Sequence, residues 1–151
     1  MKKLKIIQLE SFYANFLNRI YESDSNLQNF SFDTQIKFLL NTGFSGGQNF
    51  VPFLNPAQWE SHYIILNNVW AQVKWANENG KTGIGSMSEI LLEQINQIEP
   101  DVLFISDIPG FDFNLIPHFK KRPLIVGWLA TVVNHELPWH EVDVILSGIS
   151  D

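Results

Sequence analysis

The sequence predicts an α/β fold in which helices cover both faces of a parallel β-sheet, and three observations lead to this class. Short apolar runs without polar alternation are typical of strands that are buried on both faces of a parallel sheet. Segments with the apolar spacing of helices separate these runs, as in βαβ units with right-handed crossovers. Apolar residues make up 45% and charged residues 17% of the 151 residues, which indicates one globular domain over 1–151.

Five apolar runs are the predicted strands, at 4–9, 62–66, 102–106, 124–129 and 142–147. Helices alternate with them, and two or three helices stand between the first strand and the second. We therefore expect a Rossmann-like, doubly wound parallel sheet of five or six strands with a helical insertion after the first strand. The expected spatial order is 3-2-1-4-5, with the first and fourth strands central.

The first half of the chain carries the insertion. Apolar residues have helical spacing between Phe12 and Tyr21, and a polar loop follows over 22–29. A second helix is expected after a cap at Ser31 or Asp33. The next segment opens at 44–48 and contains Pro52 and Pro56, which kink or break a helix.

The second half is more regular. A helix is expected over 69–79, with Gly80 as the residue just past its end. Ser86 and Glu89 have the spacing of a capping box, which predicts a helix that begins there and ends before Pro100. Residues 111–119 are expected to form a short helix or an irregular crossover.

Charge and composition exclude several classes of function. The net charge is −6, from 10 Lys and Arg against 16 Asp and Glu, and an acidic chain without a basic stripe is a poor nucleic-acid binder. The chain has no cysteine, which excludes disulfides and thiolate metal sites and fits a reducing, cytoplasmic location. No stretch approaches the roughly 20 apolar residues that a transmembrane helix needs.

Several segments in the second half occur in a familiar order. They are Asn67…Gln72…Trp75-Ala76…Glu78…Gly80, then Leu91-Leu92 and Gln94-Ile95, then Glu99-Pro100-Asp101-Val102-Leu103-Phe104 with Asp107, and finally Ile125-Val126-Gly127 and Val142-Asp143-Val144-Ile145-Leu146-Ser147. This order resembles the N-terminal domain of a group of bacterial GT-B glycosyltransferases, which also carry early aromatic helices like Phe12-Tyr13, Phe16-Leu17 and Tyr21. The resemblance covers nearly the whole chain and rests on many weak positions.

The resemblance implies that the chain is the acceptor-side half of a two-domain enzyme. Such an enzyme transfers a sugar from a nucleotide-sugar donor to a glycan or another hydroxyl acceptor. Its C-terminal domain, which binds the nucleotide sugar, would follow Asp151, so the 151-residue chain is expected to be inactive alone. We expect that domain and a sugar or glycan acceptor as partners, and no cofactor. Pro52 and Pro56 depart from the family, which has a more regular helix there.

The first candidate site is Ser45-Gly46-Gly47 at a predicted helix start. Ligands of open α/β sheets bind outside the carboxyl ends of the strands. Glycines at a helix N-terminus let an anion approach the N–H groups there, and the resemblance implies a place near the donor diphosphate. The alternative is a Ser N-cap followed by a flexible turn.

Two further candidates follow the third and fourth strands. Asp107 could accept the proton of an acceptor hydroxyl, or it could only cap its own turn. His135 suits acid–base chemistry, and Glu136 and Trp139 could contact a sugar; the alternative is a solvated loop with one packed tryptophan. We expect Gly46, Asp107 and His135 to line one concavity, with Asp107 partly exposed. His62, His118 and His140 lack metal-ligand spacing, so no metal is expected.

A stand-alone flavodoxin-like regulatory or ligand-binding module is the alternative function. A receiver domain needs an acidic pair after its first strand and a lysine after its fifth, where this chain has Glu10-Ser11 and Ser147-Gly148. A cobalamin-binding domain needs Asp-x-His, which is absent. A nicotinamide-dependent dehydrogenase needs G-x-G-x-x-G after the first strand, where Glu10-Ser11-Phe12 stands instead.

Overall fold

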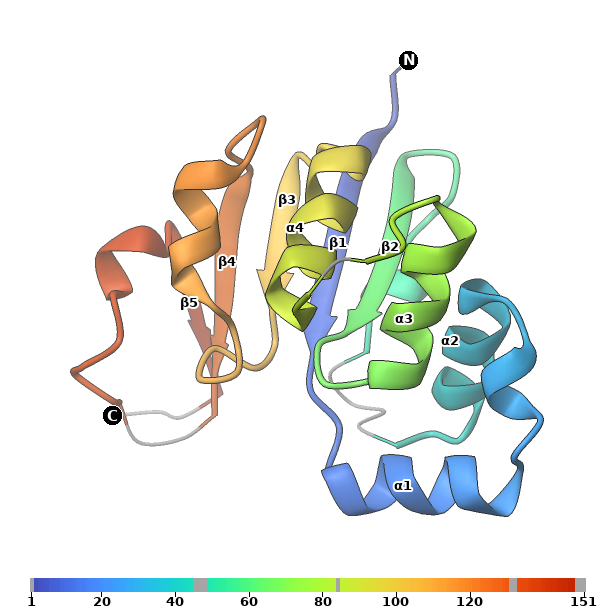
Figure 1. Cartoon of the computed structure of the whole chain (residues 1–151). Helices are drawn as coiled ribbons and strands as arrows, with labels where there is room; N and C mark the ends of the chain where they lie inside the picture. Colours follow the sequence, from blue (N-terminus) through green and yellow to red (C-terminus); the bar gives the residue numbers. More distant parts are fainter. Residues whose placement is uncertain (1, 45–48, 84, 131–132, 149–151) are drawn as a thin grey trace.

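A five-stranded, all-parallel sheet forms the centre of the protein (Figure 1). The computed structural model describes residues 2–44, 49–83, 85–130 and 133–148. The strands are β1 (Leu4–Glu10), β2 (Trp59–Ile65), β3 (Val102–Ile105), β4 (Leu124–Leu129) and β5 (Val144–Ser147). The predicted α/β class, the parallel Rossmann-like sheet and all five strand positions are confirmed.

The order of the strands is β2-β1-β3-β4-β5, so the expected order 3-2-1-4-5 is wrong. β3 lies at the centre and pairs with β1, with Ile7 opposite Leu103. The reason lies at the start of β3, where Asp101 accepts a hydrogen bond from the Lys5 backbone N–H at 2.8 Å and donates its own N–H to the Lys5 carbonyl at 2.8 Å. The long connection from β2 therefore crosses β1 before β3 begins.

Four α-helices connect the strands: α1 (Ala14–Ser23), α2 (Phe32–Asn41), α3 (Val69–Glu78) and α4 (Met87–Ile98). The shorter 3₁₀ turns are η1 (Leu27–Asn29), η2 (Val51–Phe53), η3 (Phe113–His118) and η4 (Trp139–Glu141). The predicted caps are present, because the Ser31 side chain accepts from the Thr34 N–H and Ser86 and Glu89 form the capping box. Gly80 has φ +67°, as its place past the end of α3 requires.

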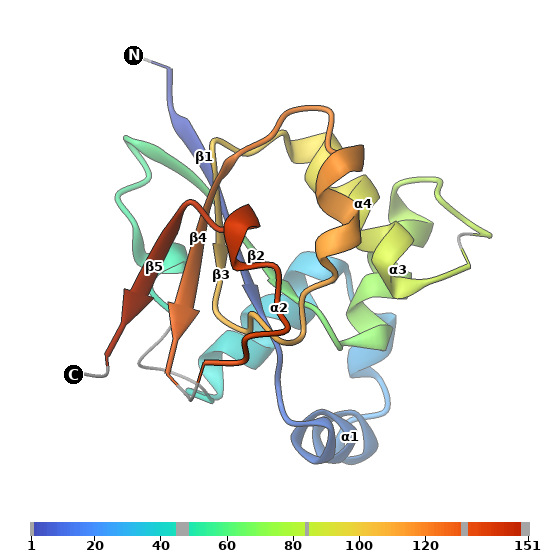
Figure 2. The same ribbon diagram turned by 90° about the vertical axis from the view of Figure 1, so that its left-hand side faces the viewer.

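The two faces of the sheet have different covers. On one face, α4 and η3 pack on a core of buried aliphatic side chains, which includes Ile7, Leu9, Leu103, Ile105 and Ile125. On the other face, the segment that leads into η2 places Phe50 edge-on against Phe104, with ring centroids 4.8 Å apart. Figure 2 shows α3 and α4 on one side of the sheet and the η2 segment on the other.

The insertion after β1 forms a second core with α1 and α2. Its buried members include Phe12, Leu17, Tyr21, Ile36 and Leu39, and they pack against the end of β2. Figure 1 shows α1 beyond the carboxyl ends of β1 and β2. No helix within the described ranges is long and apolar enough to cross a bilayer.

Candidate functional site

The carboxyl ends of β1 and β3 form the point at which the chain changes direction across the sheet. β1 connects to β2 on one side, whereas β3 connects to β4 on the other, and ligands of α/β sheets bind at such a switch point. Glu10 ends β1, and Ser106 and Asp107 follow β3. The Ser106 N–H donates to the Leu9 carbonyl at 2.8 Å, which brings these residues together.

A pocket of about 150 Å³ opens beside the ends of β3 and β4. Its polar wall consists of Ser106, Asp107 and Asn134, and the indoles of Trp128 and Trp139 form part of its apolar wall. Among the described residues that line it, none is Lys, Arg or His. The Trp128 indole N–H is buried and has no hydrogen-bond partner in the described part of the chain. The pocket therefore offers carboxylate, hydroxyl and amide groups beside aromatic rings, without a cation.

Asp107 is partly exposed, as expected. Its carboxylate accepts no hydrogen bond from the residues that the structure describes, so it does not cap its own turn. Gly110 closes this turn by donating its N–H to the Asp107 carbonyl at 3.2 Å. A Cβ atom at Gly110 would collide with the Asp107 carboxylate and lie 2.9 Å from the Ser11 Oγ atom. A side chain at residue 110 would therefore displace the Asp107 carboxylate from its present place.

Glu10 lies behind Ser106 and Asp107 and is only 5% exposed. Its Oε1 atom accepts from the Ser11 N–H at 3.3 Å, and its Oε2 atom has no hydrogen-bond partner among the described residues. Burial raises the pKa of Glu10, the Ser106 hydroxyl and the Ser11 N–H lower it, and the Asp107 charge raises it. Glu10 is not among the site residues predicted from the sequence, although a carboxylate at the end of an apolar strand is a signal for one.

Tyr63 on β2 is a second buried polar side chain at this edge, near Glu10. Its hydroxyl donates to Asn49 Oδ1 at 2.6 Å. Burial raises the pKa of Tyr63 far above its ordinary value, and the nearby Glu10 carboxyl raises it further. Tyr63 therefore stays a neutral hydrogen-bond donor at physiological pH.

The loop after β4 places its predicted site residues differently. Trp139 lines the pocket, and its indole N–H donates to the Asn134 carbonyl at 2.7 Å. His135 and Glu136 are exposed and do not line the pocket, although they belong to the same loop at the same edge as Asp107. Ser45, Gly46 and Gly47 lie outside the described residues. Of the expected concavity of Gly46, Asp107 and His135, only Asp107 lines this pocket, where it is joined by Trp139, and Gly46 is not described.

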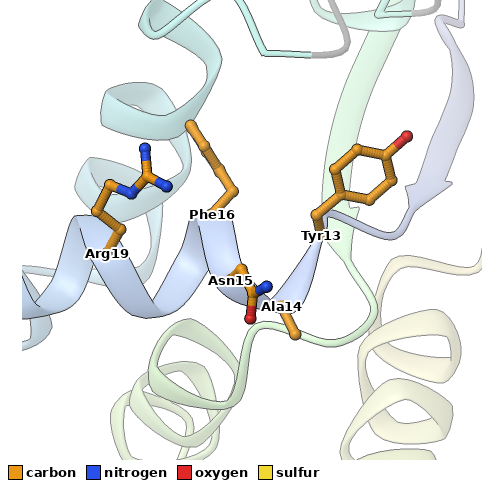
Figure 3. A pocket seen from close by; sticks show the side chains of 5 residues that line it. All are labelled: Tyr13, Ala14, Asn15, Phe16 and Arg19. Carbon is orange, nitrogen blue, oxygen red and sulfur yellow. The ribbon is translucent and has the colours of Figure 1, made fainter.

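Two other hollows are larger, but the residues that follow β3 and β4 do not line them. One of about 410 Å³ lies along α1, where Phe16 and Arg19 point to one side of the helix and Asn15 to the other (Figure 3). None of the described residues that line it carries a carboxylate. The other, of about 570 Å³, lies between β2 and α2, α3 and α4, away from the carboxyl edge, and its His62 pairs with Glu60 at 3.0 Å.

No three or more His, Cys, Asp or Glu side chains within the described ranges gather into a group that could hold a metal ion. Comparison with known proteins finds no matching family model, no matching curated protein and no matching solved structure. The geometry of the pocket is therefore the main guide to what this domain does.

Proposed function

We propose that this chain is the acceptor-side domain of a glycosyltransferase that transfers a sugar from a nucleotide-sugar donor to the hydroxyl of a glycan or another acceptor. One observation carries the proposal. The Asp107 carboxylate accepts no hydrogen bond from the described residues, and it lines a pocket that also contains two indoles. That pocket lies at the carboxyl edge of a Rossmann-like sheet, where ligands bind in this class of fold.

The chemistry of the pocket suits a neutral, polyhydroxylated ligand. Indole faces such as those of Trp128 and Trp139 can stack on the face of a sugar ring. Asp107 and Asn134 supply acceptors and donors for hydroxyl groups. No described cation lines the pocket, so it is poorly suited to the donor diphosphate. The donor would be bound by the second domain that the resemblance implies.

Asp107 would act as the general base of the transfer. Its carboxylate would take the proton of the acceptor hydroxyl while the acceptor oxygen bonds to the anomeric carbon and the nucleoside diphosphate leaves with the bonding pair. A positioned base typically contributes about 10²–10⁴-fold to the rate. His135 is a second candidate for this proton, but it would have to move from its exposed position toward the pocket. Ser45, Gly46 and Gly47 stay candidates for the donor side.

The first test is binding by the 151-residue chain itself. Indole N–H resonances of Trp128 and Trp139 should shift when glucose, galactose, N-acetylglucosamine or rhamnose is added at millimolar concentration. Asp107→Asn should weaken these shifts, and Glu136→Gln, at an exposed carboxylate outside the pocket, should leave them unchanged. Calorimetry with uridine- and guanosine-diphosphate sugars should give no micromolar binding. Indole resonances that shift with none of these sugars would contradict the proposal, and so would a tight nucleotide complex.

A stand-alone ligand-binding module with a flavodoxin-like sheet is the second candidate. The observed strand order β2-β1-β3-β4-β5 favours it, because this is the order of flavodoxin-like folds. Its ligand would lie at the junction of β1 and β3, beside Glu10 and Asp107. Titration with flavin mononucleotide separates the two candidates. Quenching of the flavin fluorescence with one-to-one stoichiometry would support the module, and no quenching is expected of the acceptor-side domain.

A further inference from the structure

The buried carboxyl of Glu10 has no part in the transfer described above. It ends β1, where Leu9 pairs with Ile105, so the next residues along the two strands are Glu10 and Ser106. Packing alone would favour an apolar side chain at this depth, as at Ile6 on the same face of β1, which is also 5% exposed. A buried carboxyl with one oxygen unpartnered among the described residues is costly. Such a cost at a switch point indicates a role in the site.

Gln8 determines what the Ser106 hydroxyl can do. Gln8 Oε1 accepts from the Val51 N–H at 3.3 Å, which fixes the orientation of the amide, and Gln8 Nε2 donates to Ser106 Oγ at 2.9 Å. Gln8 and Glu10 lie on the same face of β1, two residues apart. Because Ser106 Oγ already accepts from Gln8, its single proton can point toward Glu10 or into the pocket that Ser106 lines.

We propose that Glu10 is a positioning residue of the pocket and acts through Ser106. An ionised Glu10 attracts the Ser106 proton, so the Ser106 oxygen and the Asp107 carboxylate then offer only hydrogen-bond acceptors to the pocket. A protonated Glu10 donates to Ser106 Oγ instead, and the Ser106 proton turns into the pocket, toward Asp107 or a ligand hydroxyl. The inference rests on the proposed function for the identity of that ligand, but the coupling of the three residues does not depend on sugar transfer.

The surroundings of Glu10 favour its protonated form. Burial is the main cause of its raised pKa, and the charge of Asp107, from the turn after β3, adds to it. Tyr63 from β2 is the other titratable group that faces Glu10, and it is neutral. The Ser106 hydroxyl and the Ser11 N–H act in the opposite direction, and no cation of the described chain contributes. Glu10 therefore changes its charge at a pH above that of an ordinary glutamate.

The experiment is a pH titration of the 151-residue chain by NMR. The Glu10 carboxyl carbon and the Ser106 and Asp107 amides should move together, with a midpoint above the ordinary value of 4.5. In Glu10→Gln, an amide that donates as the protonated acid does, this common step should vanish and both amides should stay near their acid-form positions. Glu136→Gln is the matched control and should keep the step. Ser106→Ala is the second variant: Glu10 should still titrate, and the Asp107 response should fall at least twofold.

Either of two results would overturn the inference: Glu10 titrates without moving the Ser106 and Asp107 amides, or the same step persists in Glu10→Gln. If Glu10→Gln does not fold, the Ser106→Ala comparison alone decides, because an undiminished Asp107 response there removes Ser106 as the link. The sugar titration stays a separate test. Sugar binding without the coupling would contradict this inference alone, and coupling without sugar binding would contradict only the proposed function.

Discussion

Carboxylates at the amino edge of the sheet form ion pairs, whereas those at the carboxyl edge have no described cation as a partner. At the amino edge, Asp101 precedes β3 and Asp143 precedes β5. Each accepts a hydrogen bond at 2.8 Å from a backbone N–H of the neighbouring strand, and each pairs with a cation, Lys121 or Arg122. At the carboxyl edge, Glu10 and Asp107 have no described cation beside them. The paired carboxylates define strand pairing, whereas Asp107 at the carboxyl edge remains available to a ligand and Glu10 lies buried behind it.

The pKa shifts follow the same division. The Lys121 ammonium and the Lys5 N–H lower the pKa of Asp101, and the Ile125 N–H and the Arg122 guanidinium lower that of Asp143. Burial raises the pKa of Glu10. Perturbed carboxyl groups occur in structural networks as well as in functional sites, so the direction of the shift and the partners separate the two kinds here.

The largest expected effect is on catalysis. Asp107→Asn in the two-domain enzyme that the proposed function requires should lower turnover about a hundredfold, because a general base is lost. The stability of the domain should not change, since Asp107 accepts no hydrogen bond from the described residues. Steady-state kinetics and urea unfolding measure the two quantities. Unchanged turnover would show that Asp107 is not the general base and that another residue, such as His135, takes the proton.

A substitution at Gly110 tests the carboxyl edge of the sheet, because it displaces the Asp107 carboxylate. Gly110→Ala should push the Asp107 side chain out of place and cost about 1–2 kcal/mol of stability, toward the low end for overpacking because the displaced atoms end flexible side chains. Gly85→Ala is the matched control, because a Cβ atom there meets Glu89 Oε2 at an ordinary 3.5 Å. Urea unfolding of both variants measures the difference. Equal stabilities would mean that the turn after β3 has room that the structure does not show.

Loss of a paired carboxylate should have a smaller effect, confined to stability. Asp101→Ala removes the acceptor of the Lys5 N–H and the partner of Lys121, and we expect a cost of about 1 kcal/mol, because the carboxylate is partly solvent-exposed. Asp107→Ala should cost less. Urea midpoints of the two variants test this order, and a reversed order would contradict the division between the edges.

The pH dependence of stability should have opposite slopes below 3.8 and above 4.5, the ordinary pKa values of Asp and Glu. The lowered pKa values of Asp101 and Asp143 stabilise the fold above their unfolded value of 3.8, and this contribution is lost as the pH falls through the folded values. The raised pKa of Glu10 favours the fold below its unfolded value of 4.5, and this contribution is lost as the pH rises through the folded value.

Glu10→Gln tests this sign. It should make the chain more stable than the wild type at neutral pH and leave stability nearly unchanged below the unfolded pKa of Glu10. Urea unfolding of both proteins across the pH range measures the difference. A variant that is less stable at neutral pH would show that the ionised carboxylate has a partner in the fold.

The sequence predicted the elements of this fold better than their arrangement. Apolar runs and caps depend on neighbouring residues, so the strands and the helix that begins after Ser86 could be predicted. Strand order depends on which backbone an element meets across the sheet. β1 and β3 pair over four residues, beside the reciprocal hydrogen bonds between Lys5 and Asp101, and the two strands are far apart in the sequence.

The candidate site was predictable in part for a similar reason. Asp107 and Trp139 could be named because strand-end loops carry function disproportionately often, and both line the pocket. His135 has suitable chemistry, but its loop turns around Asn134 and leaves it exposed. Glu10 was missed because one acid at the end of an apolar run has no partner within its own segment. Its neighbours, Ser106 and Asp107, come from another strand.

β5 has a consequence for the behaviour of the chain in solution. All four of its residues are exposed, with Val144, Ile145 and Leu146 at 39%, 45% and 43%, and its outer side pairs with no strand of the described chain. An aliphatic edge strand without charge, proline or bulge is a template for strand addition between molecules. Concentrated solutions of the 151-residue chain should therefore aggregate through this edge, and a gatekeeper charge such as Leu146→Lys should keep the protein soluble for longer.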